Sequence, residues 1–328
     1  MLEEAIMGLI DLHCDTLSKI VNTAQSLKKN ELQVDLEKLK RAGTSAQFFA
    51  CFVNAGNYKK EEKISWEEAY QAVLDMIGRM EQETEKEESL QVVRSAEELE
   101  ERCKNRKISA FLTVEEGGVL NGSQKRLEEL REKGISLITL TWNYENCIGF
   151  PNSPDPERME KGLKPFGIET VEHMNALGML VDVSHLSDGG FWDCIRCSSR
   201  PIVASHSNAR ALCGHPRNLT DDMLRALAEK GGVAGLNFYP LFLRDGGDNV
   251  TVDDIACHAA HMLRVAGEEL PALGSDFDGF KMEENKDYLQ DAGDMEKLWY
   301  SLKKQKITER QIDKIWSENA ARLIRNVL

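Results

Sequence analysis

Histidine and carboxylate side chains stand at the ends of several short apolar runs in this 328-residue sequence. The first run reads Leu9-Ile-Asp-Leu-His13-Cys-Asp15, so His13 and Asp15 project to the same face if the segment is a strand. An imidazole and a carboxylate that converge in an apolar setting need a neutralising partner. This pair alone leaves two interpretations open, a divalent metal site and a hydrogen-bonded histidine–carboxylate pair.

Four further apolar runs end in the same residue types. The runs that begin at residues 108, 179, 201 and 270 end in Glu115-Glu116, His185, His206, and Asp276 with Asp278. Imidazole and carboxylate without thiolate suit zinc, manganese or iron, and zinc is the commonest of these at hydrolytic centres. Three histidines with two or three carboxylates exceed one tetrahedral site and fit two ions that share a carboxylate. A further carboxylate could then transfer protons.

The apolar runs alternate with amphipathic, charged segments along the chain. Eight strands are predicted, at residues 9–15, 46–54, 108–115, 135–142, 179–185, 201–207, 232–239 and 270–277. Helices are predicted at residues 66–86, 124–133, 167–177, 221–230 and 251–266. Gly134, Gly178 and Gly231 stand where helix C-caps are expected, and Thr220 stands where a helix N-cap is expected.

This alternation predicts a parallel sheet that is covered by helices on both faces. Eight units predict an α/β fold, a (β/α)8 TIM-like barrel whose active site lies at the carboxyl ends of the strands. An open doubly wound sheet is the alternative, but GxGxxG is absent after the first strand. No linker is visible, so we expect one barrel domain over residues 1–328, with two C-terminal helices at 294–304 and 308–326. The proline-containing segment 143–165 is predicted to form a loop over one barrel mouth.

Charge and hydropathy argue against several partners. The chain has 41 basic and 55 acidic residues, a net charge of −14, which argues against nucleic-acid binding. No run approaches the ~18 apolar residues of a membrane span. Residues 1–10 carry acids where a signal peptide has basic residues, so we expect a cytoplasmic protein with reduced cysteines. For Cys194-Ile-Arg-Cys197, packing is favoured over a redox or metal role.

The remaining polar residues are ambiguous on their own. Arg217 follows the sixth predicted strand and is either a surface arginine or a clamp for a substrate carboxylate. His173, His258 and His261 lie within helical patterns and are expected to be packing or surface residues. His215 precedes a proline in a loop, and a location at the barrel mouth is one alternative for it.

Six motifs, in order and with matching spacing, resemble the membrane (renal) dipeptidase family, peptidase family M19. They are His13-Cys-Asp15, Val114-Glu115, Asp182-Val-Ser-His185, Ser205-His206-Ser207, Arg217-Asn218 and Gly274-Ser-Asp276-Phe-Asp278-Gly279. The resemblance runs from about residue 9 to residue 326 and implies a barrel of the metal-dependent hydrolase type. Without a leader or a hydrophobic tail, the chain looks like the soluble bacterial-type members.

The resemblance implies a metallo-dipeptidase, a hydrolase that cleaves the peptide bond of dipeptides through a hydroxide that bridges two zinc ions. Family members often accept a D-residue at the C-terminal side, and they are often homodimers. By the family pattern, one Zn²⁺ would be held by His13 and Asp15 and the other by His185 and His206. Glu115 would bridge the two ions and so take part in catalysis.

The resemblance also assigns the residues that meet the substrate. Asp276 matches the aspartate that acts as the acid and base. Arg217 matches the arginine that holds the C-terminal carboxylate of the dipeptide, and Tyr239 matches a tyrosine that lines the same pocket. Trp142 stands where the family often has a histidine that helps to hold the substrate near the metals.

Two departures from the family pattern leave alternatives open. Glu115-Glu116 replaces the usual Glu-Gly, so either glutamate could bridge the ions; the alternation of the strand from Val114 favours Glu115. The loss of a histidine at Trp142 leaves a weakened or non-catalytic family member as one alternative. The other is a binuclear-metal amidohydrolase that acts on another amide, a lactone or a phosphoester.

Overall fold

The computed structural model describes residues 7–55, 64–281 and 285–328. The first six residues, which belong to the segment considered for a leader, lie outside the described residues. The strands are β1 (Leu9–Cys14), β2 (Thr44–Phe52), β3 (Leu90–Val92), β4 (Ile108–Glu115), β5 (Ile135–Thr139), β6 (Leu180–Asp182), β7 (Val203–Ala204), β8 (Val233–Leu236) and β9 (Pro271–Leu273). They form one parallel sheet in the order β2-β1-β9-β8-β7-β6-β5-β4-β3, and the pairing of β2 with β4 closes it.

The eight strands predicted from the sequence form this closed barrel, so the (β/α)8 prediction is confirmed and the open sheet is wrong. Apart from β2 and β4, the observed strands are shorter than predicted, because several apolar runs continue into the turns that carry polar side chains. The ninth strand, β3, was not predicted. It pairs with the first half of β4, while β5 pairs with the second half. Three residues are too few to show the alternation by which a strand is recognised.

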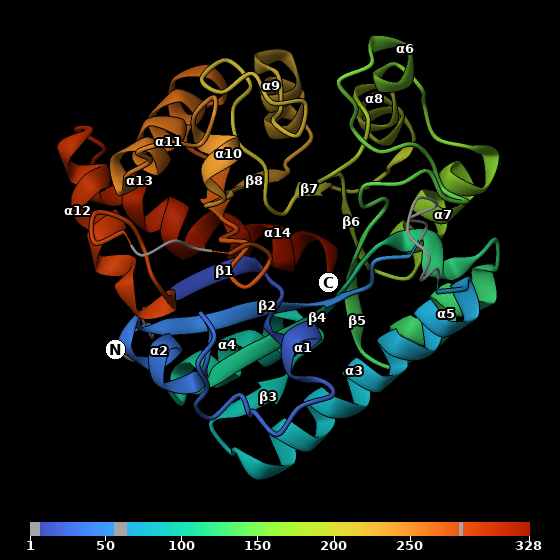
Figure 1. Cartoon of the computed structure of the whole chain (residues 1–328), viewed down its shortest axis with the longest axis horizontal. Coiled ribbons are helices and arrows are strands. Elements are labelled where there is room, and N and C mark those ends of the chain that lie inside the picture. Colours follow the sequence, from blue (N-terminus) through green and yellow to red (C-terminus); the bar gives the residue numbers. More distant parts are fainter. Residues whose placement is uncertain (1–6, 56–63, 282–284) are drawn as a thin grey trace.

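Helices surround the barrel (Figure 1). They are α1 (Thr16–Ile20), α2 (Leu36–Arg41), α3 (Trp66–Lys86), α4 (Ala96–Lys104), α5 (Gln124–Glu132), α6 (Pro156–Met159), α7 (Pro165–Ala176), α8 (Asp188–Cys197), α9 (Asp221–Glu229), α10 (Pro240–Leu243), α11 (Val252–Ala266), α12 (Met295–Lys304), α13 (Glu309–Asp313) and α14 (Asn319–Val327). The helix predicted at 308–326 is divided, because a π-helical turn (Lys314–Glu318) separates α13 from α14. In Figure 1, α14 lies beside β1. None of the described helices has the length and apolar character to cross a membrane.

The predicted helix ends are formed by local chemistry. The Thr220 hydroxyl accepts a hydrogen bond from the backbone N–H of Met223 (3.2 Å) at the start of α9. Gly134, Gly178 and Gly231 follow helices with positive φ angles, which glycine adopts without steric cost. After each of these helix ends the chain turns back to the barrel and begins the next strand.

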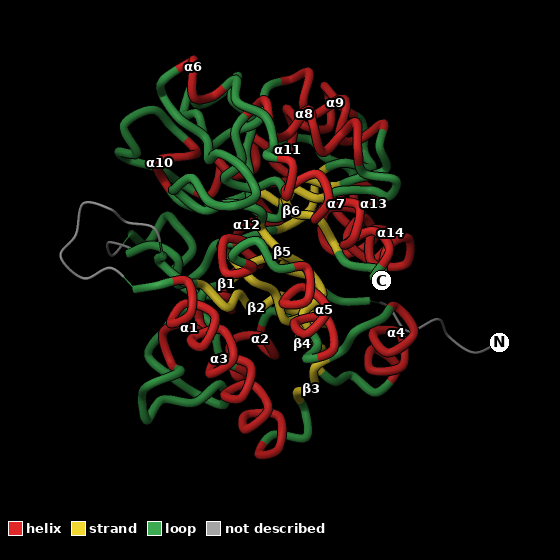
Figure 2. Tube along the Cα trace, turned by 90° about the vertical axis from the view of Figure 1, so that its right-hand side faces the viewer, coloured by secondary structure: helices red, strands yellow, loops and turns green. Residues whose placement is uncertain are grey.

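The two ends of the barrel differ. In Figure 2, α1 and α10, which follow β1 and β8, lie at one end of the barrel, and α4 and α14 lie at the other end. The predicted loop at 143–165 lies at the first end and carries only the short helix α6. Its Asn152 N–H donates to the carbonyl of His185 (2.7 Å), which ties the loop to the turn after β6.

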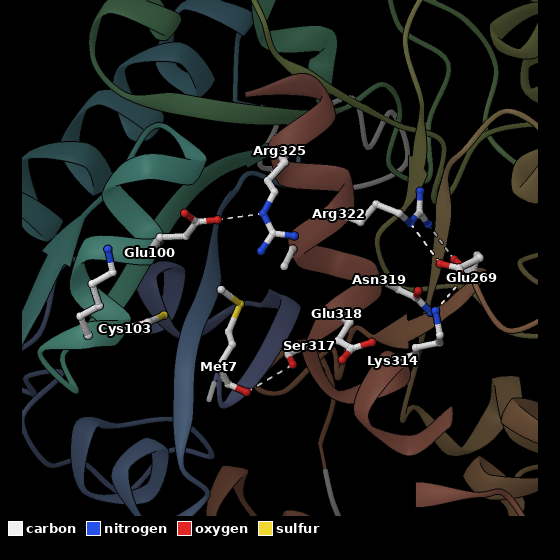
Figure 3. Close-up of a pocket in the computed structure, with 12 residues that line it drawn as sticks. Met7, Glu100, Cys103, Glu269, Lys314, Ser317, Glu318, Asn319, Arg322 and Arg325 are labelled. Carbon is white, nitrogen blue, oxygen red and sulfur yellow. Dashed lines mark hydrogen bonds and ion pairs between the residues drawn. The ribbon is translucent and has the colours of Figure 1, made fainter. Parts of the chain in front are cut away.

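A cavity of about 610 Å³ lies at the other end, between α4 and α14 (Figure 3). Charged residues line it, and most of them pair with one another: Arg325 bonds Glu100 (2.8 Å), and Lys314 bonds Glu269 (2.5 Å). Barrel enzymes place their chemistry at the opposite end. The candidate site is therefore expected at the end of the barrel where the strands end. That residues 1–328 form a single domain stays a prediction.

Candidate metal centre and active site

The mouth of the barrel brings together the polar residues that end five strands. His13 lies near the end of β1 and Glu115 ends β4, while His185, His206 and Asp276 lie in the turns after β6, β7 and β9. His185 and Asp276 adopt positive φ angles of 66° and 62°, so the chain turns sharply as it presents these side chains. The residues are far apart in the sequence and meet because the sheet closes.

His13 is surrounded by carboxylates. Its Nε2 atom lies 3.5 Å from Asp15 Oδ2, 3.5 Å from Glu115 Oε2 and 3.9 Å from Asp276 Oδ1. Ligand atoms around a tetrahedral zinc ion, with bonds of about 2.0–2.1 Å, lie roughly 3.3 Å apart. The spacing of His13, Asp15 and Glu115 is close to that value.

A second group forms on the other oxygen of Glu115. His185 Nε2 lies 3.1 Å from Glu115 Oε1, and His206 Nε2 lies 3.6 Å from the same oxygen. The two Nε2 atoms lie 3.1 Å apart. One carboxylate thus faces the His13 group with one oxygen and the His185–His206 group with the other, which is the geometry of a bridging ligand.

Several buried atoms of this cluster have no hydrogen-bond partner among the described residues. They include both ring nitrogens of His13 and Oδ1 of Asp15. Burying polar groups without a partner is costly, and a cation would remove that cost. His13, Glu115 and His206 form one group that could hold an ion, and His13, Asp15 and Asp276 form another. The residues therefore fit a metal centre.

Burial and charge shift the pKa values of these groups in opposite directions. Burial, with the Asp15 carboxylate beside it, raises the pKa of Glu115 to about 8. Burial lowers the pKa values of His185 and His206 well below the ordinary value, and neutral imidazole is the form that binds metal. Burial also opposes the charge on His13, but Glu115 and Asp15 hold its pKa well above the ordinary value. The site thus carries an excess of carboxylates that a cation would balance.

Glu116 points away from this cluster. Its carboxylate accepts hydrogen bonds from the Gly118 N–H (2.8 Å), the Asn146 amide (2.6 Å) and the Trp142 N–H (3.3 Å). Burial raises its pKa to about 7. Of the two glutamates, the geometry favours Glu115 as the bridge, and Glu116 holds the start of the 143–165 loop.

Arg217 is buried with its charge only partly satisfied. One Nη1–H donates to the Ser207 hydroxyl (2.6 Å), whereas Nε and Nη2 are buried without a partner among the described residues. Burial lowers its pKa to about 10, so the guanidinium stays charged at neutral pH. Two unused donors on a planar cation suit a carboxylate. This placement is not that of a surface loop arginine.

Aromatic rings surround the mouth. The Trp142 ring packs edgewise on Phe52, with centroids 4.8 Å apart, and lies 6.4 Å from the His185 ring. The half-buried Tyr239 packs on Phe242 (4.9 Å) and Phe280 (5.0 Å). Trp142 therefore places an aromatic ring beside the histidine–carboxylate cluster, at the position where the family often has a histidine.

Sequence reasoning missed residues that hold the cluster from outside. Asn143 Oδ1 lies 3.1 Å from His185 Nδ1, and the Asn237 amide donates to Asp276 Oδ2 (2.9 Å). His258, expected to be a packing residue, is buried and accepts the Ala209 N–H (3.1 Å) at Nδ1. The signal in the sequence was that Asn143 directly follows the predicted strand at 135–142 and that Asn237 lies near the end of the predicted strand at 232–239.

The other residues considered from the sequence lie outside the cluster. His173 and His261 belong to helices, and each pairs with an acid, Glu128 (3.3 Å) and Asp221 (2.7 Å). His215 lies in the Arg217 loop, and its ring is tilted against that of Phe242, with centroids 4.7 Å apart. The eight cysteines are all free thiols. Cys194 and Cys197 lie on the outer helix α8 and belong to neither of the groups that could hold an ion.

The sequence profile of the membrane dipeptidases, peptidase family M19, matches residues 3–328. The chain belongs to peptidase family M19. The family predicted from the six motifs is confirmed, and so are the barrel and the class of enzyme, a metallo-dipeptidase with a metal cofactor. A non-catalytic scaffold is not supported by this match.

Relatives of this M19 peptidase are found in bacteria and fungi. It is 35% identical over 251 residues to an uncharacterised dipeptidase of Schizosaccharomyces pombe, covering 75% of this chain and 60% of that one. It is 37% identical over 237 residues to an uncharacterised protein encoded in the pqqA 5′ region of Klebsiella pneumoniae, covering 69% and 85%. A metallopeptidase of Rhodobacter sphaeroides, solved with a phosphinate mimic of L-Ala-D-Ala, superposes with a TM-score of 0.88 at 26% identity, covering 98% and 100%.

Proposed function

We propose that this M19 metallo-dipeptidase binds two zinc ions per chain and hydrolyses dipeptides, including those with a D-residue at the C-terminal side. The observation that carries the proposal is the position of Glu115, whose Oε2 lies 3.5 Å from His13 Nε2 while its Oε1 lies 3.1 Å from His185 Nε2. His13 and Asp15 would hold one ion, and His185 and His206 the other. The L-Ala-D-Ala mimic bound to the Rhodobacter sphaeroides metallopeptidase supports this class of substrate.

Asp276 would transfer the proton in this reaction. When bound, the two ions would supply a polarised water and a Lewis acid for the scissile carbonyl. Asp276 Oδ1 lies at the cluster, 3.9 Å from His13 Nε2, while Oδ2 accepts the Asn237 amide. That bond fixes the carboxylate so that one oxygen stays free to take the proton of the attacking water and return it to the leaving amine.

Arg217 selects for the free end of the substrate. Its unused Nε and Nη2 donors would bind the C-terminal carboxylate, which limits the substrate to one residue beyond the scissile bond. Trp142 and Tyr239 would line the pocket on either side. A homodimer and a cytoplasmic location stay predictions.

Removal of the metal is expected to abolish dipeptide hydrolysis, and added zinc to restore it, because the ions would supply the polarised water and the Lewis acid for the scissile carbonyl. Metal analysis of the reconstituted protein should find about two zinc ions per chain. Zinc should also raise the melting temperature, since a ligand at 100 times its Kd stabilises by about 2.7 kcal/mol. Less than one bound ion after reconstitution would contradict the proposal. N-acyl amino acids, lactones and phosphoesters in the same assay test the alternative substrates.

Arg217→Ala is expected to raise KM, because hydrogen bonds to a charged group contribute about 1.5–3 kcal/mol, or roughly 10–150-fold. The measurement is steady-state kinetics on a dipeptide and on its C-terminal amide, which lacks the carboxylate. The amide should be a poor substrate for the wild type and no poorer for the variant. Arg210→Ala is the matched control, because Arg210 lies in the same loop but is already paired with Asp188 (2.7 Å). An unchanged KM for Arg217→Ala would place the clamp elsewhere.

A further inference from the structure

Two buried aspartates behind the metal cluster make the same set of hydrogen bonds. Asp11 lies on β1, two residues before His13. Its Oδ1 accepts the backbone N–H of Ser275 (2.8 Å), and its Oδ2 accepts the Ser275 hydroxyl (2.6 Å) and the Gln47 amide (3.0 Å). One carboxylate thereby joins β1 to β2 on one side and to the turn after β9 on the other.

Asp182 repeats this arrangement elsewhere in the barrel. It ends β6, three residues before His185. Its Oδ1 accepts the backbone N–H of Ser205 (2.9 Å), and its Oδ2 accepts the hydroxyls of Ser205 (2.6 Å) and Thr139 (2.6 Å). It thereby joins β6 to β5 and to the turn after β7. Each aspartate with its serine is called a clamp below.

Each clamped serine directly precedes a residue of the active site. Ser205 precedes His206, and Ser275 precedes Asp276. Neither aspartate belongs to the groups that could hold an ion. The clamps therefore act on the site only through the residues that they hold.

The Asp182–Ser205 clamp decides which nitrogen of His206 carries the proton. The Ser205 hydroxyl has one hydrogen, and the short bond to a carboxylate takes it in preference to the longer contact with the Ser184 hydroxyl (3.3 Å). His206 Nδ1 lies 2.7 Å from the same Ser205 oxygen, so Nδ1 must donate. The other nitrogen, Nε2, then keeps its lone pair and faces Glu115 and His185.

The Asp11–Ser275 clamp acts on Asp276 through the backbone. Asp276 has a φ of 62°, which costs free energy for a residue with a side chain. The Asp276 N–H donates to the His13 carbonyl (3.2 Å), and the Phe277 N–H donates to the Ser275 hydroxyl (3.2 Å). The turn that presents Asp276 is thus held on both sides of the residue.

We propose that Asp11 and Asp182 are positioning residues with separate tasks. The Asp182–Ser205 clamp sets the tautomer of His206 for metal binding, and the Asp11–Ser275 clamp sets the turn that carries the Asp276 carboxylate. The first task rests on the proposed metal roles of His185 and His206, and the second on the proposed proton transfer by Asp276.

The two tasks predict different defects for Ser205→Ala and Ser275→Ala. Ser205→Ala should weaken the binding of one of the two zinc ions by about 10–100-fold, the usual cost of losing an outer-sphere partner, and excess zinc should restore activity. Ser275→Ala should bind both ions normally and lose kcat with little change in KM, and excess zinc should not help. Zinc titration and metal-dependent kinetics measure both effects. Ser109→Ala, which removes a buried strand hydroxyl without a partner among the described residues, should match the wild type.

Asp182→Asn tests the tautomer directly. An asparagine amide in place of Oδ2 can no longer accept the Ser205 hydrogen, which turns toward His206 Nδ1 and places the ring proton on Nε2. Nitrogen-15 NMR of histidine-labelled, metal-free protein should find His206 protonated at Nδ1 in the wild type and at Nε2 in the variant. This readout needs no turnover, and a purely structural clamp would not change it.

The outcomes separate the two proposals. Two zinc ions bound equally tightly by the wild type and Ser205→Ala, or an unchanged tautomer in Asp182→Asn, would overturn the inference and leave the proposed function standing. If both serine variants lost zinc affinity and kcat equally, and the melting temperatures of the metal-free proteins fell alike, the clamps would only stabilise the fold and would not have separate tasks. A wild-type protein that binds less than one ion would overturn the proposed function itself.

Discussion

Asp276→Asn is expected to lower kcat by about 10²–10⁴-fold while both metal ions stay bound, since that range is the usual contribution of a positioned acid or base. The amide keeps the shape of the side chain and its contact with Asn237, but it cannot take up a proton at neutral pH. KM should change little, because the proposed carboxylate contact belongs to Arg217. The measurement is steady-state kinetics with the metal content determined on the same samples.

Asp278→Asn is the matched control for this experiment. Asp278 lies two residues further along the same turn, but its carboxylate accepts from Thr16 (2.5 Å) and Gln33 (2.7 Å) and stays out of the cluster. Its kcat should remain near that of the wild type. Asp276 also lies within reach of His13 and Asp15 as a third group around one ion. Loss of an ion in Asp276→Asn would therefore make Asp276 a metal ligand, and full activity would exclude it from proton transfer.

Glu115→Gln is expected to lose at least one of the two ions and to reduce activity by more than the about 10–100-fold that loss of an outer-sphere partner costs. The physical reason is that both carboxylate oxygens face groups that could bind a metal ion, whereas glutamine offers a single acceptor oxygen. Its amide N–H would point at one of those groups. Zinc content per chain and kcat on one dipeptide are the measurements.

Glu116→Gln provides the comparison at the neighbouring position. It should keep two ions, because the Glu116 carboxylate faces Gly118, Asn146 and Trp142 instead of the histidines. Its free energy of unfolding should fall by about 1–3 kcal/mol, since the amide leaves a buried donor unsatisfied. Urea unfolding of the metal-free protein measures this loss. If Glu116→Gln lost an ion and Glu115→Gln kept both, the assignment of the bridge would be reversed.

The architecture could be predicted from the sequence because its signals are local. Apolar runs that alternate with amphipathic segments predict strands and helices wherever each element is long enough to show its period, as in α3, which begins and ends at the predicted residues. Closure follows from the number of units. The three-residue strand β3 and the π-helical turn before α14 were missed, because neither has a length or a composition that marks it.

The sequence by itself determined which residue types end the strands, and hence the class of chemistry that the barrel mouth can perform. Only the tertiary structure shows that Glu115 faces the histidines while Glu116 faces Gly118, Asn146 and Trp142, because the turn gives adjacent residues at a strand end different directions. It alone showed the bonds between Asp11 and Ser275, which are 264 residues apart. Such contacts carry no sequence period, since they form between side chains that meet only when the first and last strands of the barrel pair.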